Sequence, residues 1–169
     1  MLEELALSYA ARFATSGARL EAYLRRKMRE RGVAEDAGQL DPRAVVERLV
    51  ELKYVDDEAY ARARADGLLR RGYGGRRVDQ ALRMAGISEE LRAEVSPQEA
   101  SSRKAAVDMA RRRSFGPFGV QPIERDKREK QIAAMIRAGH SYDAARTVVD
   151  AATTEQVEHW LAEAEEEAE

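Results

Sequence analysis

The sequence contains no cysteine, few aromatic residues and no long apolar run. Without cysteine the chain can form neither disulfides nor thiolate metal sites, which fits a reducing compartment. Aromatic residues make up 6% of the chain and charged residues 36%, as expected for helices with wide solvated faces. No stretch approaches the roughly 20 apolar residues that cross a bilayer, and the acidic start Leu2-Glu3-Glu4 is unlike a signal peptide. We therefore expect a cytoplasmic protein with no membrane segment.

Motifs of the common enzyme classes are also absent. The chain has no GxxxxGK[ST] loop, no GxGxxG, no HExxH and no cysteine nucleophile. We interpret His140 as a helix-end residue that packs its ring and His159 as a solvated residue. We interpret the acids Asp56, Asp57 and Glu58 as helix-capping residues rather than metal ligands. The sequence therefore predicts no catalytic residue, no metal and no cofactor, and it favours a protein that acts by binding.

The stretch from residue 55 to residue 88 reads as two helices joined by a glycine-rich corner. The first helix has small or apolar residues at helical spacing, namely Tyr60, Ala63, Gly67 and Leu68. The second helix has a similar face, formed by Val78, Ala81, Leu82 and Ala85. Gly72 and Gly86 stand where each helix is expected to end. Neither helix can bury its apolar face alone, so this unit needs neighbours.

Those neighbours are copies of the same element. The helix stop at Gly86 is repeated 54 residues earlier at Gly32 and 53 residues later at Gly139. A further helix is expected before and after each copy, and strand-like alternation is absent from the sequence. We therefore predict an all-α fold that forms an elongated, curved array. Its predicted parts are three three-helix repeats at residues 1–55, 56–96 and 97–152, and an acidic C-terminal helix at residues 153–169.

Charge is segregated along the chain, although the net charge is only −2. Residues 153–169 hold seven acids and no lysine or arginine, which leaves 29 basic against 24 acidic residues in the remainder. A basic body with an acidic tail recurs in proteins that meet nucleic acid or a polyanionic assembly. We expect Val157, Trp160 and Leu161 to dock on the third repeat, with the acids beside its basic surface, where they would compete with an anionic ligand. The alternative is a tail that serves only solubility.

Runs of arginine are the candidate partner-binding or DNA-binding residues. Two arginines end one helix of the central element and two begin the next, so four guanidinium groups are expected to converge on one corner. Arginine suits bidentate contact with phosphate or carboxylate groups. The alternative for each run is an ordinary solvated face. The candidates are Arg25, Arg26, Arg29, Arg70, Arg71, Arg76, Arg77, Arg111, Arg112 and Arg113.

Aromatic and methionine side chains are interpreted mainly as packing residues. Tyr73, Phe115 and Phe118 lie next to arginine runs, where they would either stack on bases or dock a partner. Packing in a core or loop is the more common role for such residues. The methionines interpreted as core filler are Met28, Met84, Met109 and Met135.

Three stretches carry motifs of a known family. LKYVDDEAYARARADGLLRRGYGGRRVDQALRMAGIS has a DDE-aromatic-Ala opening, an Arg-Arg-Gly, and a Gly-x-Arg-Arg-(apolar) run that leads to Gly-Ile-Ser. It resembles the central repeat of RecX, the bacterial regulator of the RecA recombinase. LEAYLRRKMRERGV with AVVERLVELKYVDD, and KREKQIAAMIRAGHSYDAARTVV, are similar to the first and last repeats of that family. The sequence departs from the family at Gly75, where proline is common, and in residues 34–40 and 114–123, which lengthen two repeats.

The resemblance implies a modulator of the RecA filament. RecX proteins bind the RecA–DNA filament, lodge in its groove and curb its recombination and co-protease activities. The resemblance therefore implies steric occlusion and blocked subunit exchange, with no cofactor, and we expect a monomer. The alternative is a helical-repeat protein that binds single-stranded or duplex DNA directly through arginine-rich, helix-turn-helix-like pairs. Such a protein would bind duplex DNA alone, with a steep salt dependence.

Overall fold

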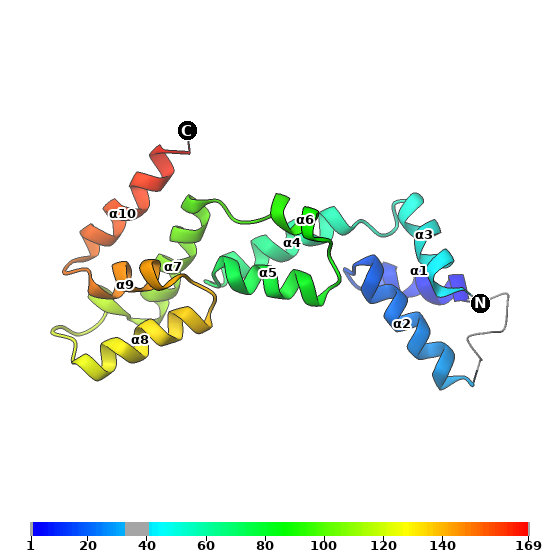
Figure 1. Cartoon of the computed structure of the whole chain (residues 1–169), viewed down its shortest axis with the longest axis horizontal. Coiled ribbons are helices and arrows are strands. Elements are labelled where there is room, and N and C mark those ends of the chain that lie inside the picture. The colour runs from blue at the N-terminus through cyan, green and yellow to red at the C-terminus, as the bar shows by residue number, and fades with distance from the viewer. Residues whose placement is uncertain (1, 33–40, 169) are drawn as a thin grey trace. The chain divides into compact units, whose positions relative to one another are not determined.

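All secondary structure in the described part of the chain, residues 2–32 and 41–168, is helical in this computed structural model (Figure 1). The elements within these residues are α1 (Leu2–Arg12), α2 (Gly17–Glu30), α3 (Pro42–Glu51), α4 (Asp57–Arg70), α5 (Gly75–Met84), α6 (Glu89–Glu94), α7 (Glu99–Arg113), the 3₁₀ helix η1 (Gly116–Phe118), α8 (Arg125–Arg137), α9 (Tyr142–Asp150) and α10 (Thr154–Glu166). This confirms the predicted all-α fold of tandem three-helix repeats followed by a last helix. The residues 34–40 that lengthen the first repeat lie outside the described residues.

Side-chain caps define where several helices begin. Ser16, Asp41 and Ser141 each accept a backbone N–H of the first turn of α2, α3 and α9, at 3.3, 2.9 and 3.1 Å. Asp56 does the same for α4 at 3.0 Å, which confirms the capping role expected for this acid. Replacing such a cap with alanine typically costs about 1 kcal/mol. The helix boundaries are therefore encoded locally.

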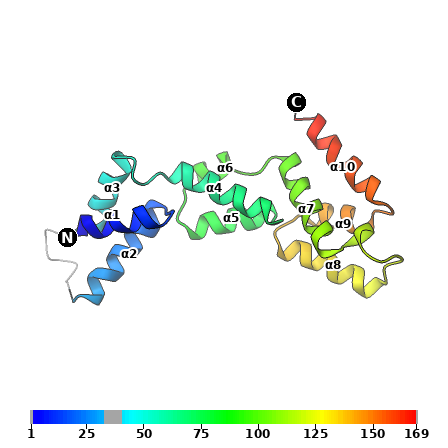
Figure 2. The same cartoon turned by 180° about the vertical axis from the view of Figure 1, so that it is seen from behind.

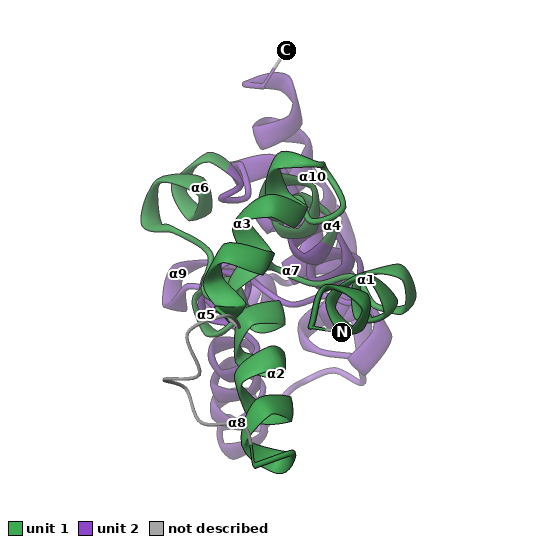
Figure 3. Ribbon diagram, turned by 90° about the vertical axis from the view of Figure 1, so that its right-hand side faces the viewer, with its two compact units in different colours: residues 1–63, 82–94 green, residues 64–81, 95–169 purple. Residues whose placement is uncertain are grey.

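Contacts divide the chain into two compact units (Figure 3). The first unit comprises residues 1–63 and 82–94, and the second comprises residues 64–81 and 95–169. The division passes through α4 and α5, so the central repeat contributes residues to both units.

The core of the first unit is formed by α1, α2 and α3. Leu20, Leu24 and Met28 lie four residues apart on one face of α2, and all three are buried. They belong to the same apolar cluster as Ala6 of α1 and Leu49 of α3. Burying one such leucine fully contributes about 1.5–3 kcal/mol relative to leaving it exposed. The spacing of four therefore accounts for the orientation of α2 in this unit.

The core of the second unit is formed by α7, α8, α9 and η1. Val107, Met135 and Val148, one from each α-helix, are at most 1% exposed. Phe115, which follows α7, is also buried in this cluster. This confirms the interpretation of Phe115 as a packing residue.

Helix α10 packs along α7 in the second unit (Figure 2). Val157 is 1% exposed, and Trp160 and Leu161 are partly buried against the core, so the predicted docking of this stripe is confirmed. Arg111, near the end of α7, pairs with the first half of α10, whereas Arg103, near the start of α7, donates to the Trp160 carbonyl oxygen at 2.6 Å. The two helices therefore run antiparallel, and the acidic end of α10 lies at the start of α7.

In the second unit, the corner between α4 and α5 docks on the end of α8. The Gly74 N–H donates to the Ala138 carbonyl oxygen at 2.9 Å, and the Arg76 N–H donates to the Gly139 carbonyl oxygen at 3.2 Å. A Cβ atom on Gly74 would overlap the Gly139 carbonyl group, so only glycine fits there. We call this backbone contact between residues 72–76 and 138–140 the glycine joint.

A corresponding contact occurs in the first unit, at the start of α2. The Ser16 hydroxyl donates to the Ala85 carbonyl oxygen at 2.5 Å, and the Gly17 N–H donates to Asp57 Oδ1 at 2.8 Å. In both units the start of one repeat's second helix thus meets the end of the next repeat's second helix. Backbone groups at helix ends lack hydrogen-bond partners within the helix, and these contacts between repeats supply partners for some of them.

Some side chains differ from the predicted packing. Met84, expected in a core, is 80% exposed because it lies about 200° around α5 from the buried Leu82. Ala63 is also exposed, and the buried face of α4 runs instead through Ala61 and Leu68. Alanine occupies alternate positions in this part of α4, so the sequence pattern could not select a face. The other methionines interpreted as core filler are buried as expected: Met28, Met109 and Met135.

Candidate partner-binding surface

Four arginines surround the corner between α4 and α5. Arg70 and Arg71 lie at the end of α4, Arg76 and Arg77 lie in the first turn of α5, and all four are exposed. The guanidinium carbons of Arg71 and Arg77 lie 5.7 and 6.0 Å from the centroid of the Tyr73 ring. Cation–π contacts at exposed sites contribute roughly 0.5–1 kcal/mol each. Tyr73 therefore helps to hold two cations side by side.

A fifth arginine, Arg112 of α7, reaches the same corner. Its Nη2 donates to the Arg70 carbonyl oxygen at 2.7 Å. Arg111 instead pairs with Glu158 of α10 at 3.1 Å, and Arg113 stacks on an aromatic ring of the third repeat. Consecutive residues lie about 100° apart around a helix, so this arginine run is divided among three surfaces. The set that we call the arginine corner is Arg70, Arg71, Arg76, Arg77 and Arg112.

The arginine corner carries uncompensated positive charge. Across residues 2–32 and 41–168, no carboxylate oxygen lies within 4.0 Å of a side-chain nitrogen of these five arginines. Other arginines pair with an acid one helical turn away, as Arg43 does with Glu47 (2.9 Å) and Arg62 with Glu58 (2.8 Å). Guanidinium groups without such partners are available to bind external phosphate or carboxylate groups.

The arginine corner is supported from below by the glycine joint and by His140. The His140 ring is 3% exposed, and its Nε2 lies 2.8 Å from the Gly72 carbonyl oxygen. Burial lowers the pKa of His140 from its ordinary value of 6.5, and the hydrogen bond to Gly72 opposes this shift. The neutral ring therefore donates its Nε2–H to the carbonyl group. This confirms the structural interpretation of His140.

The three candidates of the first repeat lie on α2, in the first unit. Arg25 pairs with Glu21 at 2.8 Å, and Arg26 lies 3.6 Å from Glu30. Arg29 is exposed on the same helix. Two of these three cations are thus partly neutralised within their own helix, unlike those of the arginine corner.

A second group of cations lies in the third repeat, and only Arg113 of this group was among the predicted candidates. Lys127, Lys130 and Arg137 of α8 surround a hollow, and Arg113 from α7 completes the group. The α8 residues stand at i, i+3 and i+10, a helical spacing that is visible in the sequence. Arg113 comes from another helix, so only the fold reveals that it belongs with them.

The fold and the arginine corner together define a class, namely an all-helical protein of tandem three-helix repeats with a cationic surface. Among the described residues, no three His, Cys, Asp or Glu side chains are grouped in a way that would hold a metal ion. None of the described helices is both long enough and apolar enough to cross a bilayer. Residues 56–95 match the family described as RecX, second three-helix domain.

Relatives with known names extend this match over most of the chain. The chain is 34% identical to the regulatory protein RecX of Myxococcus xanthus, over 88% of its length and 84% of the relative. It is 36% identical to the regulatory protein RecX of Agrobacterium fabrum, over 82% of its own length and 76% of the relative. The chain therefore belongs to the RecX family, which confirms the resemblance seen in the sequence.

Solved structures show the same fold. A crystal structure of RecX from Lactobacillus salivarius superposes with a TM-score of 0.66 at 19% identity and covers 88% of this chain and 92% of that one. A second structure, of the regulatory protein RecX, superposes with a TM-score of 0.65 at 18% identity and covers 89% of this chain and 72% of that one. At these identities the likeness shows the fold alone.

Proposed function

We propose that this RecX-family protein binds the RecA–DNA filament and inhibits the recombinase, ATPase and co-protease activities of RecA. The family assignment supports this, because its relatives are named regulatory proteins. The observation that carries the proposal is the arginine corner, which presents five guanidinium groups without a carboxylate partner in the described part of the chain. A RecA–DNA filament offers both phosphate and carboxylate groups to such a surface.

The proposed mechanism is steric. The bound protein occupies filament surface and hinders subunit exchange, so it needs no covalent chemistry and no cofactor of its own. Because the glycine joint fixes the backbone beneath the arginine corner, the cations are positioned before binding and less conformational entropy is lost on contact. We propose that the protein acts as a monomer in the cytoplasm.

Co-sedimentation tests this proposal. Filaments are assembled from RecA, single-stranded DNA and a non-hydrolysable ATP analogue and are then pelleted with the protein. We expect the protein to pellet with filaments but not with single-stranded DNA alone, and to slow ATP hydrolysis by RecA in a parallel assay. Equal pelleting with and without RecA, together with unchanged hydrolysis, would contradict the proposal.

Direct nucleic-acid binding is the second candidate function. The position of Tyr73 between Arg71 and Arg77 favours it, because an aromatic ring flanked by cations can accept a stacked base beside its phosphates. A direct binder would bind duplex DNA without RecA, and log K would fall by about 0.9 per phosphate contact for each tenfold rise in salt. Titrating labelled duplex at several salt concentrations therefore separates the two candidates.

A further inference from the structure

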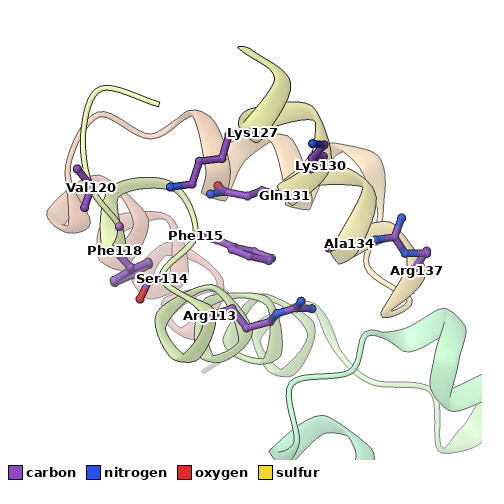
Figure 4. A pocket seen from close by; sticks show the side chains of 11 residues that line it. Arg113, Ser114, Phe115, Phe118, Val120, Lys127, Lys130, Gln131, Ala134 and Arg137 are labelled. Carbon is purple, nitrogen blue, oxygen red and sulfur yellow. The ribbon is translucent and has the colours of Figure 1, made fainter. Parts of the chain in front are cut away.

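A hollow of about 690 Å³ opens in the third repeat, lined by residues that do not belong to the arginine corner (Figure 4). Its volume lies within the range of roughly 300–1,000 Å³ typical of ligand sites. The apolar part of its lining includes Phe115, Phe118 and Val120, and Val120 is 80% exposed. Four cations from two helices surround this apolar part: Arg113, Lys127, Lys130 and Arg137. No carboxylate residue lines the hollow.

The cations around the hollow are unpaired, whereas their neighbours on the same helix are paired. Arg125 pairs with Glu129 at 3.1 Å, and Arg128 pairs with Asp150 at 2.5 Å. By contrast, Lys127 and Lys130 have no carboxylate within 4.0 Å among the residues that the structure describes, and the same holds for Arg113 and Arg137. On α8, the cations that do not line the hollow are therefore paired with acids, whereas those that line the hollow are not.

A positioned hydrogen-bond donor adds to the lining of the hollow. Gln131 is 5% exposed, and its Oε1 accepts the Gly116 N–H at 2.9 Å, which fixes the orientation of the amide. Its Nε2 group has no protein partner among the described residues and lines the hollow. This Nε2 group keeps contact with solvent, so an acceptor group in the hollow can replace water as its hydrogen-bond partner.

The aromatic rings of the hollow leave little free face for base stacking, because Phe115 is 9% exposed and Phe118 is partly buried against the core. The Arg113 guanidinium carbon lies 4.9 Å from the centroid of the Phe115 ring, and the Arg111 guanidinium carbon lies 5.5 Å from that of Phe118. Single-stranded nucleic acid is normally held by bases stacked on free aromatic faces. A ligand with carboxylate groups and aliphatic side chains fits the donors and the apolar lining without needing such faces.

The acidic tail of the same molecule is not placed to fill the hollow. Helix α10 runs antiparallel to α7, and Glu163 lies 3.8 Å from Arg103, ten residues before Arg113. Ten helical residues span about 15 Å. The acids Glu165 and Glu166 of α10 therefore lie at the opposite end of α7 from the hollow, so this helix does not fill it.

We propose that this hollow binds an acidic peptide segment of a partner protein. Carboxylates of the peptide contact Arg113, Lys127, Lys130 and Arg137, one acceptor reaches Gln131 Nε2, and an aliphatic side chain packs against Phe118 and Val120. This site shares no residue with the arginine corner, and the inference does not depend on RecA binding.

Fluorescence anisotropy of the full chain with a labelled peptide of sequence EELEELE tests the proposal. We expect saturable binding, weaker binding of the matched peptide EEAEEAE, and backbone amide NMR shifts at Gly116 and Gly119. The double variant Lys127→Glu/Lys130→Glu should bind about tenfold or more weakly, because two contacts become repulsive. The matched control is Lys104→Glu/Arg146→Glu, which makes the same charge change on exposed sites outside the hollow and should bind within about twofold of wild type.

Several results would overturn the proposal. Absence of binding would do so, and so would equal weakening by both double variants, which would indicate non-specific attraction. Tighter binding of single-stranded DNA that is lost only in the Lys127→Glu/Lys130→Glu variant would identify a nucleic-acid site instead. Melting curves verify that each variant is folded, and should one unfold, the single Lys127→Glu and Lys130→Glu variants are measured with the same criteria.

Discussion

The His140 ring donates to the Gly72 carbonyl oxygen across 68 residues of sequence, at 2.8 Å and almost without exposure to solvent. The contact links the end of α8 to the corner between α4 and α5, directly beneath the arginine corner. The buried ring can be protonated only at a cost in folding free energy. This histidine therefore connects the stability of the second unit to pH.

Stability should fall as pH drops below the ordinary histidine range. Because burial lowers the pKa of His140 below 6.5 in the folded state, the unfolded chain binds the extra proton first, and acidification favours unfolding. Stability is full above about pH 6.5 and declines between that pH and the folded pKa. Thermal melts at pH 7.5 and 5.5 should show a larger loss for wild type than for His140→Gln, whereas the exposed His159→Gln variant should behave like wild type. Identical pH profiles for all three proteins would contradict the prediction.

Glycine at position 74 should be essential to the joint. Gly74→Ala brings a Cβ atom into the Gly139 carbonyl group, and overpacking of this kind costs about 1–3 kcal/mol. The matched control is Gly67→Ala, at an open position inside α4, which should stabilise the protein by about 0.5–1 kcal/mol. Urea unfolding of the two variants should therefore shift in opposite directions.

Leu82 and Met84 should respond very differently to truncation. Leu82 is 1% exposed and Leu82→Ala should lower the free energy of unfolding by about 2–5 kcal/mol. Met84→Ala, on the exposed side of the same helix, should change it by less than about 0.5 kcal/mol. If denaturant unfolding showed comparable losses of unfolding free energy for the two variants, the difference in burial between Leu82 and Met84 would be contradicted.

The arginine corner should contribute to binding and not to folding. Arg76→Glu/Arg77→Glu should weaken filament co-sedimentation by a few kcal/mol at most, because attraction is replaced by repulsion at a partly desolvated contact. Its melting temperature should barely change, since exposed charges contribute little to stability. The control Arg43→Glu/Arg62→Glu makes the same net charge change at paired, exposed sites and should leave binding intact. A strong drop in melting temperature for Arg76→Glu/Arg77→Glu would show that these residues are structural.

The acidic tail should reduce weak DNA binding. Its glutamates crowd the end of α10, where the helix dipole disfavours negative charge by about 0.3–1 kcal/mol each, so stability does not explain them. Replacing them with glutamine should raise affinity for single-stranded DNA, most strongly at low salt. The positions are Glu163, Glu165, Glu166, Glu167 and Glu169, of which Glu169 lies outside the described residues. Identical titration curves for wild type and variant would leave solubility as the role of the tail.

Local patterns predicted much of the fold. The apolar positions of α5, the cap at Asp56 and the stripe of α10 follow from spacing and side-chain chemistry, and the structure has them as expected. The buried face of α4 could not be predicted from the sequence, because alanines at alternate positions do not repeat with the period of a helix. Met84 was misassigned because residue type alone does not determine a position around a helix.

The site was less predictable than the fold, for a geometric reason. The glycine joint is made by backbone groups, which leave no side-chain pattern except glycine itself. The run from Arg111 to Arg113 looks like one site in sequence, yet the helical rotation sends its members to three surfaces. Arg113 and Lys127 line the same hollow only because α7 and α8 contribute to one core.

The glycine joint also affects which segments of the chain unfold together. The carbonyl groups of Ala138 and Gly139 at the end of α8 accept hydrogen bonds from backbone N–H groups at the corner of the preceding repeat. A third repeat excised on its own would leave those carbonyl groups and the His140 ring open to water. In hydrogen exchange, the segments that unfold together should therefore not coincide with the sequence repeats. The backbone amides of the α4–α5 corner should be protected to the same degree as those of α8.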